Sequence, residues 1–271
     1  MVSMASIVGM VVSLLICLVL PLGGLLWLVT RREGGVRKYP KVGRAFAAGM
    51  VAFVLSQVLT RIPLMTWLST QDAPWAQWLV SGPVASFSAG LFEETGRLLV
   101  MLWLLRSFHR WVDGISFGLG HGGIEAILLV GLTQLSSLAI ALLINTGQTA
   151  ALGQLPAGTR DQVVTALTDT SPLQFYLVGV ERIAAIGLHV GLSVLILWGI
   201  VAGRRAFAWL IAVLIHGVFN LVAVLLVSSG LPNATLLTEG ALLVMTIVLW
   251  AVFVLRCRPR FPVDIQPAPA R

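Results

Sequence analysis

Acidic, basic and imidazole side chains recur in the middle of apolar stretches of this sequence. An ionisable group at the centre of a membrane helix costs about 2.5–3.5 kcal/mol on insertion scales. Groups of this kind are therefore retained mainly for pairing or for function. They fall in four consecutive stretches and comprise Glu93, Glu94, Arg97, His121, Glu125, Glu181, Arg182, His189 and His216. We expect the four stretches to form a bundle with a polar centre, and Glu181-Arg182 is equally well explained as a structural ion pair.

The spacing of these residues predicts which of them share a helix face. Four residues turn a helix about 40° beyond one full turn, so residues four apart lie on one face. The pairs with this spacing are Glu93 with Arg97, His121 with Glu125, His189 with Ser193, and His216 with Asn220. We therefore expect one shared polar layer, open toward the cytoplasmic half. Glu93 and Glu94 point about 100° apart, so only one of them faces the centre, and Arg97 can reach either.

Carboxylates and imidazoles gathered in this way can activate a water molecule for hydrolysis of an amide bond. In one route, His121, Glu125, His189 and His216 supply the ligands of a zinc ion with an open position for water. In the other route no metal is needed, and a buried glutamate acts as general base on water held by a histidine. His216 and Asn220 can bind the substrate carbonyl and its developing oxyanion. Composition does not choose between the routes, and the His-Glu-x-x-His signature of soluble zinc proteases is absent.

The composition places these residues in a membrane protein. Of 271 residues, 58% are hydrophobic and only 11% are charged, which excludes an ordinary soluble domain and a disordered chain. The predicted fold is all-α, a polytopic transmembrane helical bundle of about seven spans. The seven apolar runs are roughly 4–30, 45–68, 84–105, 114–143, 173–202, 206–227 and 239–255.

The charges of the connecting segments predict the orientation. Lys and Arg gather in segments 31–44, 106–110 and 204–205 and after residue 255, whereas the alternate segments hold only Arg160. Because basic loops stay on the cytoplasmic side, the N-terminus is expected outside and the C-terminus inside. The basic loops can contact anionic lipid, and no interleaved aromatic motif supports a nucleic-acid partner despite the net charge of +7.

Residues 1–256 are interpreted as a single transmembrane domain with its catalytic spans over 84–227, and residues 257–271 as a disordered cytoplasmic tail. Spans one, two and seven are expected only to pack around the centre. Arg61, near the outer end of span two, is expected to extend to the membrane interface. Short helices are expected in the outer loops, one after Pro74 and one with Thr159 at its N-terminal cap.

The ordered motifs resemble those of a known family. Glu93-Glu-Thr-Gly-Arg97, Phe117-Gly-Leu-Gly-His121-Gly-Gly-Ile-Glu125, His189, and His216-Gly-Val-Phe-Asn220 are similar to the YhfC family of intramembrane metalloproteases. That family looks like a branch of the superfamily that holds CAAX prenyl proteases and bacteriocin-processing enzymes. The resemblance covers spans three to six.

The resemblance implies roles for individual residues. It implies that Glu93 activates water with His121, that Glu94 and Arg97 support it, and that His216 and Asn220 form the oxyanion site. The Arg follows the second Glu by three positions, where CAAX proteases have four, and Glu125 and His189 are additional to the CAAX pattern. These departures put a prenylated substrate in doubt and leave the metal question open.

The sequence therefore predicts an intramembrane peptidase of the plasma membrane that cuts a peptide or membrane-protein substrate in or near the bilayer. Its water is activated by Glu and His, with zinc as the candidate cofactor. Two alternatives stay open. A proton- or ion-coupled transporter also needs buried Glu, Arg and His, and a non-catalytic scaffold or immunity protein can keep the polar centre for packing.

Overall fold

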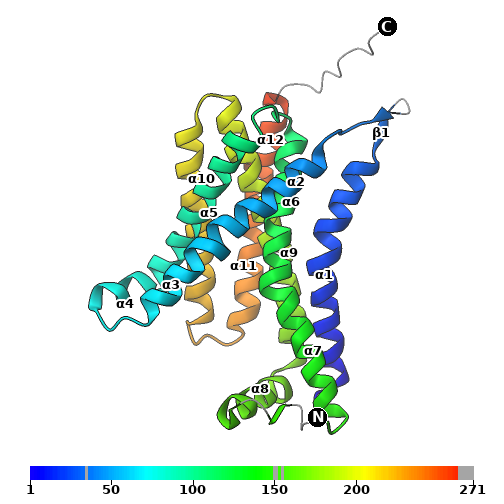
Figure 1. Ribbon diagram of the computed structural model, residues 1–271, viewed down its shortest axis with the longest axis vertical. Coiled ribbons are helices and arrows are strands. Elements are labelled where there is room, and N and C mark those ends of the chain that lie inside the picture. The colour runs from blue at the N-terminus through cyan, green and yellow to red at the C-terminus, as the bar shows by residue number, and fades with distance from the viewer. Residues whose placement is uncertain (34–35, 149–151, 154–155, 262–271) are drawn as a thin grey trace.

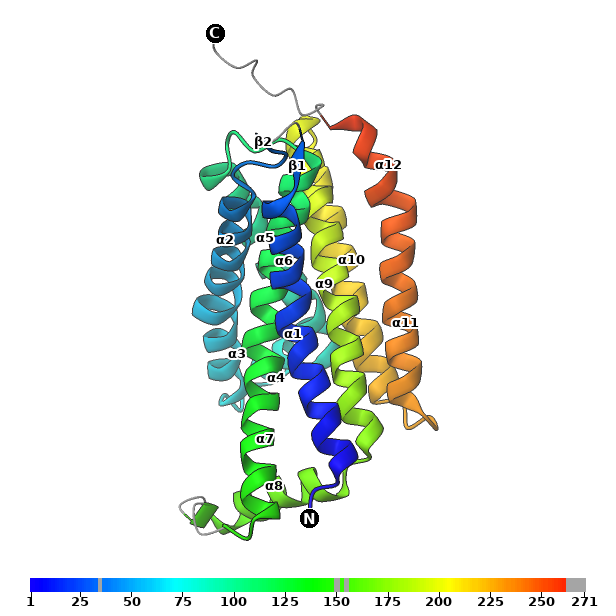
Figure 2. The same cartoon turned by 90° about the vertical axis from the view of Figure 1, so that its right-hand side faces the viewer.

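The helices lie side by side in one elongated bundle. The structure is a computed structural model and describes residues 1–33, 36–148, 152–153 and 156–261. Helices α1, α5, α6, α9, α10 and α11 run roughly along the long axis of the bundle (Figures 1 and 2). In this orientation the N-terminus and α8 lie at one end, and the β1–β2 hairpin and α12 lie at the other. The predicted all-α polytopic bundle is confirmed.

The helices follow the apolar stretches of the sequence closely. Their bounds, in chain order, are α1 Met4–Thr30, α2 Val42–Phe53, η1 Val54–Arg61, α3 Ile62–Ser69, α4 Pro74–Val80, α5 Gly82–Leu104, α6 Trp111–Glu125, η2 Ala126–Gly131, α7 Leu132–Asn145, α8 Ala157–Asp169, α9 Pro172–Val201, α10 Arg205–Val227, α11 Ala234–Leu249, η4 Trp250–Val254, α12 Leu255–Cys257 and η5 Arg258–Arg260. A short antiparallel hairpin, β1 Arg32–Glu33 with β2 Val36–Arg37, follows α1.

Six helical segments are long and apolar enough to cross a membrane. They are Met4–Thr30, Val42–Ser69, Trp111–Asn145, Pro172–Val201, Arg205–Val227 and Ala234–Arg260. Helix α5 has a comparable length of 23 residues but carries Glu93, Glu94 and Arg97 near its middle. Many large apolar side chains also stay exposed on the bundle, as a lipid-facing surface requires. The chain is thus a multi-pass integral membrane protein, while seven spans and an external N-terminus stay predictions.

Three of the long helical segments contain a π-helical section. Helices α2, η1 and α3 form one continuous tilted rod, visible in Figure 1, and α6, η2 and α7 form a second. A π-helical section widens the helix locally and recurs at functional sites. Gln57 and Arg61 belong to η1, and Glu125 immediately precedes η2. Two of the three π-helical sections, η1 and η2, therefore adjoin the polar centre of the bundle.

Glycines let α6 approach its neighbours at backbone distance. A Cβ on Gly120 would overlap the backbone carbonyl oxygen of Phe46 on α2, and a Cβ on Gly118 would overlap Val190 on α9. Small residues at such crossings are a general device of membrane helices, since they let backbones touch. The glycine-rich second half of α6 therefore fixes His121 between α2 and α9.

Helix α9 is the central element. In its most apolar 18-residue stretch, 78% of the residues are buried inside the molecule. At the end of the bundle that holds α12, its side chains pack with those of α5 and α10 into the main apolar core, which includes Val100, Leu192, Leu195 and Ala212. The core closes the bundle on that side of the polar layer.

The two expected loop helices are present as α4 and α8. Helix α8 begins at Ala157, with Pro156 as its N-cap residue, so the expected cap at Thr159 is wrong. Residues 262–271, which make up most of the predicted tail, lie outside the described residues. The tail therefore stays a prediction.

Candidate active site

The polar residues of four helices meet at one point in the bundle. Glu93 on α5, His121 on α6, His189 on α9 and His216 on α10 are all buried. The ring centroids of His121 and His189 lie 4.8 Å apart, and those of His189 and His216 lie 5.3 Å apart. The structure thus brings together residues separated by more than a hundred positions, in the shared layer that their spacing predicts.

Glu93 is at the centre of this layer. Its Oε2 lies 3.0 Å from His121 Nε2 and 3.9 Å from His189 Nδ1. Its Oε1 lies 3.8 Å from His216 Nε2 and accepts a hydrogen bond from Gln57 Nε2. Each imidazole therefore has a ring nitrogen within 4 Å of this one carboxylate.

Glu94 turns away from the centre and forms a buried ion pair with Arg97. Arg97 donates from Nε to Glu94 Oε2 at 2.8 Å and from Nη2 to Oε1 at 3.2 Å, and both side chains are completely buried. Of the two acids that Arg97 could reach, it pairs with the second. Glu94 Oε1 also lies 2.8 Å from His216 Nδ1.

The ion pair fixes the tautomers of two histidines. Because the ionised Glu94 only accepts, His216 must donate from Nδ1, which leaves its Nε2 as an acceptor directed at the centre. Arg97 only donates, so His189 Nδ1, at 2.9 Å from Arg97 Nη2, accepts. Arg97 also donates to Ser193 Oγ and to the backbone carbonyl of His189. Glu94 and Arg97 thus position the imidazoles.

A second group of charges lies beside His189. Glu125 Oε2 is 2.6 Å from His189 Nε2, and Glu125 Oε1 accepts from Arg182 Nη1 at 3.0 Å. Arg182 also pairs with Glu181, the preceding residue on α9. The Glu181–Arg182 pair, which the sequence explains equally well as purely structural, is therefore connected through Glu125 to His189.

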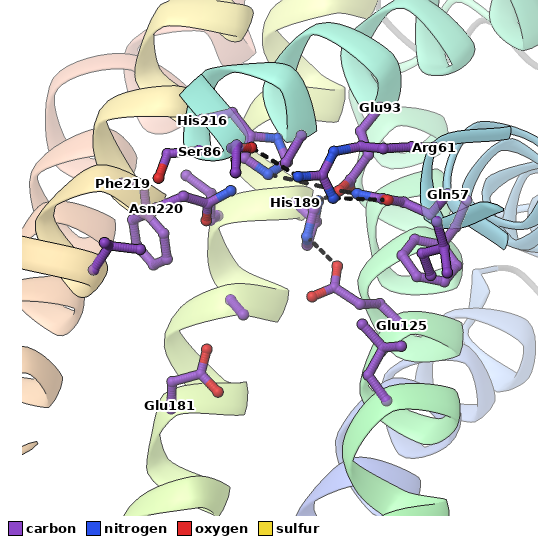
Figure 3. A pocket seen from close by; sticks show the side chains of 18 of the residues that line it. Gln57, Arg61, Ser86, Glu93, Glu125, Glu181, His189, His216, Phe219 and Asn220 are labelled. Atoms are coloured by element: carbon purple, nitrogen blue, oxygen red, sulfur yellow. Dashed lines mark hydrogen bonds and ion pairs between the residues drawn. The ribbon is translucent and has the colours of Figure 1, made fainter. Parts of the chain in front are cut away.

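The layer forms the end of a cavity of about 370 Å³. The functional side chains that line it are Gln57, Arg61, Ser86, Glu93, Glu125, Glu181, Arg182, His189, His216 and Asn220, most of which Figure 3 labels. Asn220 lies beside His216 in the wall, as the spacing of the two residues predicts. His121, Glu94 and Arg97 are not part of the lining and lie behind Glu93.

The direction of the cavity corrects one expectation. Its lining continues from Glu93 to Gly82 at the start of α5, and from His216 to Val224 near the end of α10. These are the helix ends that the loop charges assign to the outside. The opposite side is filled by the apolar core. The cavity therefore extends toward the helix ends opposite the basic loops, and not toward the basic-loop ends where the opening is expected.

Two site residues from span two were expected only to pack or to reach the interface. Gln57 contacts Glu93, and the Arg61 guanidinium donates to Ala85, Ser88 and Gln57, so Arg61 turns inward instead of extending to the interface. The available signal was their spacing of four residues, which puts both side chains on one face of the helix.

Three buried side chains converge in a way that suits a metal ion. Glu93, His189 and His216 each offer one ligand atom, and these atoms lie within 4.8 Å of one another. Imidazole and carboxylate donors fit zinc and related divalent cations. The free Nε2 of His216, oriented through Glu94 at Nδ1, has the carboxylate–histidine arrangement that is usual behind metal ligands. Glu93 and His216 therefore fit a metal as they stand, whereas His189 Nδ1 accepts from Arg97 and would have to leave that hydrogen bond to bind the ion.

This group differs from the four ligands expected from the sequence. Glu93 takes the central place, while His121 holds Glu93 from behind through Nε2 and its Nδ1 has no hydrogen-bond partner among the described residues. Glu125 contacts His189 and lies at the edge of the group.

The chain is similar to known membrane proteins of one family. The chain is 33% identical over 237 residues to "Uncharacterized membrane protein YhfC" of Bacillus subtilis (strain 168), and the match covers 83% of this chain and 86% of that protein. None of the solved structures matches the chain significantly. A profile of the YhfC intramembrane metalloprotease family matches residues 16–242, a range that holds every side chain of the layer. The chain belongs to the YhfC intramembrane metalloprotease family.

Proposed function

We propose that this protein is an intramembrane peptidase that hydrolyses a peptide bond at the Glu93 end of the cavity. The observation that carries the proposal is a cavity that ends at one carboxylate with three imidazoles around it and has an amide side chain in its wall. Hydrolysis of an amide needs an activated water and a donor for the developing oxyanion. Glu93 and Asn220 supply these two functions within one cavity.

Glu93 has a role in each of two arrangements. With a metal ion, Glu93, His189 and His216 would hold it, and the ion would lower the pKa of a bound water and polarise the substrate carbonyl. Without one, Glu93 takes a proton from water as general base and returns it to the leaving amine. Either way the water oxygen bonds to the carbonyl carbon and the carbon–nitrogen bond breaks.

The other residues support these steps. His121 and Gln57 fix the carboxylate of Glu93 from two sides. Glu94 keeps the proton of His216 on Nδ1, so that Nε2 faces the reacting groups. Asn220, one helical turn beyond His216, donates to the carbonyl oxygen of the substrate as negative charge develops there. Glu125 orients His189.

The shape of the cavity suits a hydrolase, and a transporter in a state that is open to one side has the same shape. A transport path must open to both sides of the membrane at different times. Here the cavity extends toward one end of the bundle only, and the main apolar core fills the other side of the layer. A blind cavity suits a site that admits a peptide and water and releases the products by the same route.

Cleavage by the purified protein tests this proposal. The full chain in lipid nanodiscs is incubated with a library of apolar peptides, and new termini are identified by mass spectrometry. We expect cleavage by the wild type and none by Glu93→Gln. The matched control is Glu239→Gln, which changes a buried acid outside the cavity whose Oε2 has no hydrogen bond in the described part of the chain. Equal cleavage by wild type and Glu93→Gln would contradict the proposal.

A further inference from the structure

Arg61 is a charged residue of the cavity wall that the proposed chemistry does not use. Its guanidinium reaches from η1 into the cavity (Figure 3). It donates from Nη2 to the Ala85 carbonyl at 2.7 Å, from Nε to Ser88 Oγ at 3.1 Å and from Nη1 to Gln57 Oε1 at 3.3 Å. All three acceptors are uncharged. A guanidinium has five N–H donors, so two of them have no partner in these bonds.

The positive charge of Arg61 is therefore not balanced by an ion pair. In the described part of the chain no carboxylate lies within ion-pair distance of Arg61, whereas Arg182, the other basic residue in the lining, is paired with both Glu125 and Glu181. An uncompensated charge within the apolar part of a membrane protein is unfavourable and is normally paired or kept for function. Glu93 attracts the Arg61 guanidinium electrostatically without forming an ion pair, so an anionic group of a ligand that reaches this wall of the cavity can pair with Arg61 directly.

Arg61 lies close enough to Glu93 to contact a peptide whose scissile bond is at Glu93. Its partners Ala85 and Ser88 precede Glu93 on α5 by eight and five residues, roughly 8–12 Å along a helix axis. An extended peptide covers that distance with about two to four residues. Gln57 connects Arg61 with Glu93, because its Oε1 accepts from Arg61 and its Nε2 donates to Glu93.

We infer that Arg61 is a substrate-binding residue that recognises a carboxylate of the peptide, about two to four residues from the bond that is cut. The inference rests on the cavity being the peptide site of the proposed function. Either a free C-terminal carboxylate or an Asp or Glu side chain supplies the required chemistry. A guanidinium with two unused donors can take a carboxylate through charge-assisted hydrogen bonds.

Equilibrium binding of four probe peptides tests the inference. An N-terminally labelled apolar octapeptide is prepared as the free acid, as the C-terminal amide, and as two amides that carry Glu or Gln at the third position from the end. Fluorescence anisotropy measures each dissociation constant with the full chain in phosphatidylcholine nanodiscs. The wild type should bind at least one carboxylate form about 10- to 100-fold more tightly than its neutral match. Comparison of the two pairs identifies the source of the carboxylate.

Three variants connect the preference to Arg61. Arg61→Gln should bind the acid and neutral forms alike, while Arg61→Lys should keep part of the preference because the charge is retained. The matched control is Arg160→Gln, which removes the same charge from an exposed side chain of α8 outside the cavity. It should bind as the wild type does. Thermal unfolding of each variant verifies that it is folded.

Several results would overturn the inference. Equal binding of acid and neutral peptides by the wild type is one, and an undiminished preference in Arg61→Gln is another. If phosphatidylglycerol in the nanodiscs displaces the peptides from the wild type but not from Arg61→Gln, with no acid preference, the anion is a lipid phosphate. Binding requires no turnover, so an acid preference without cleavage would reject the peptidase proposal and leave the role of Arg61 intact.

Discussion

Removal of one partner from the buried Glu94–Arg97 pair should destabilise the bundle and disable the site together. Both side chains have no exposed surface and share two hydrogen bonds, of 2.8 and 3.2 Å. In Glu94→Gln the Arg97 charge stays buried without its carboxylate. Breaking a buried pair in this way costs about 3–5 kcal/mol. We expect Glu94→Gln and Arg97→Met each to lower the free energy of unfolding by about that amount.

The double variant distinguishes a charge effect from a packing effect. Glu94→Gln combined with Arg97→Met leaves no unpaired charge, so it should be more stable than Glu94→Gln alone. The coupling energy between the two sites should reach about 2–3 kcal/mol. Unfolding by SDS titration in mixed micelles, followed by tryptophan fluorescence, measures all four proteins under one condition.

Activity should not recover in the double variant. His216 Nδ1 loses its carboxylate acceptor, 2.8 Å away, so the tautomer that directs Nε2 into the cavity is no longer fixed. Loss of a residue that orients a metal ligand or catalytic imidazole typically costs about 10- to 100-fold. Additive destabilisation by the two substitutions, or full peptidase activity in Glu94→Gln, would refute this account of the pair.

Three further outcomes are expected. Gly120→Val, whose Cβ would overlap the Phe46 carbonyl oxygen, should not yield folded protein, whereas Gly240→Ala, with open space around its Cβ, should yield wild-type amounts on size-exclusion chromatography. Gln57→Leu should lower kcat about 10- to 100-fold with little change in Tm, because it removes a hydrogen bond to Glu93; an unchanged kcat would contradict this. If a metal is held by the site, its removal by a chelator should lower Tm, and zinc at about 1,000 times its Kd should then raise the free energy of unfolding by about 4 kcal/mol. His216→Ala should show no such zinc-dependent shift.

Much of the site could be predicted because charged groups in a membrane must find partners. His121 and Glu125, four residues apart, both face the centre, and so do His216 and Asn220. The neighbours Glu93 and Glu94 diverge as their helical positions require, one toward the cavity and one toward Arg97. Helical geometry and the cost of buried charge suffice for these relations.

What could not be predicted depends on how the helices pack against each other. Gln57 is uncharged and needs a hydrogen-bond partner when buried, but nothing in the sequence identifies Glu93 as that partner. Arg61 lies near a helix end, where an interfacial position is equally favourable until the contacts with Ala85 and Ser88 are known. The position of a residue along its helix places it in the polar layer. It does not show which side of that layer neighbouring side chains fill, so the direction of the cavity could not be predicted.

The most direct test of the central claim is transfer of oxygen from water to a peptide at Glu93. The purified full chain is incubated with a cleaved library peptide in water labelled with a heavy oxygen isotope, and mass spectrometry reads the new C-terminus. The account predicts one labelled oxygen in the new carboxylate with the wild type and with Glu239→Gln, and no product with Glu93→Gln. Product formed by Glu93→Gln at the wild-type rate would contradict it.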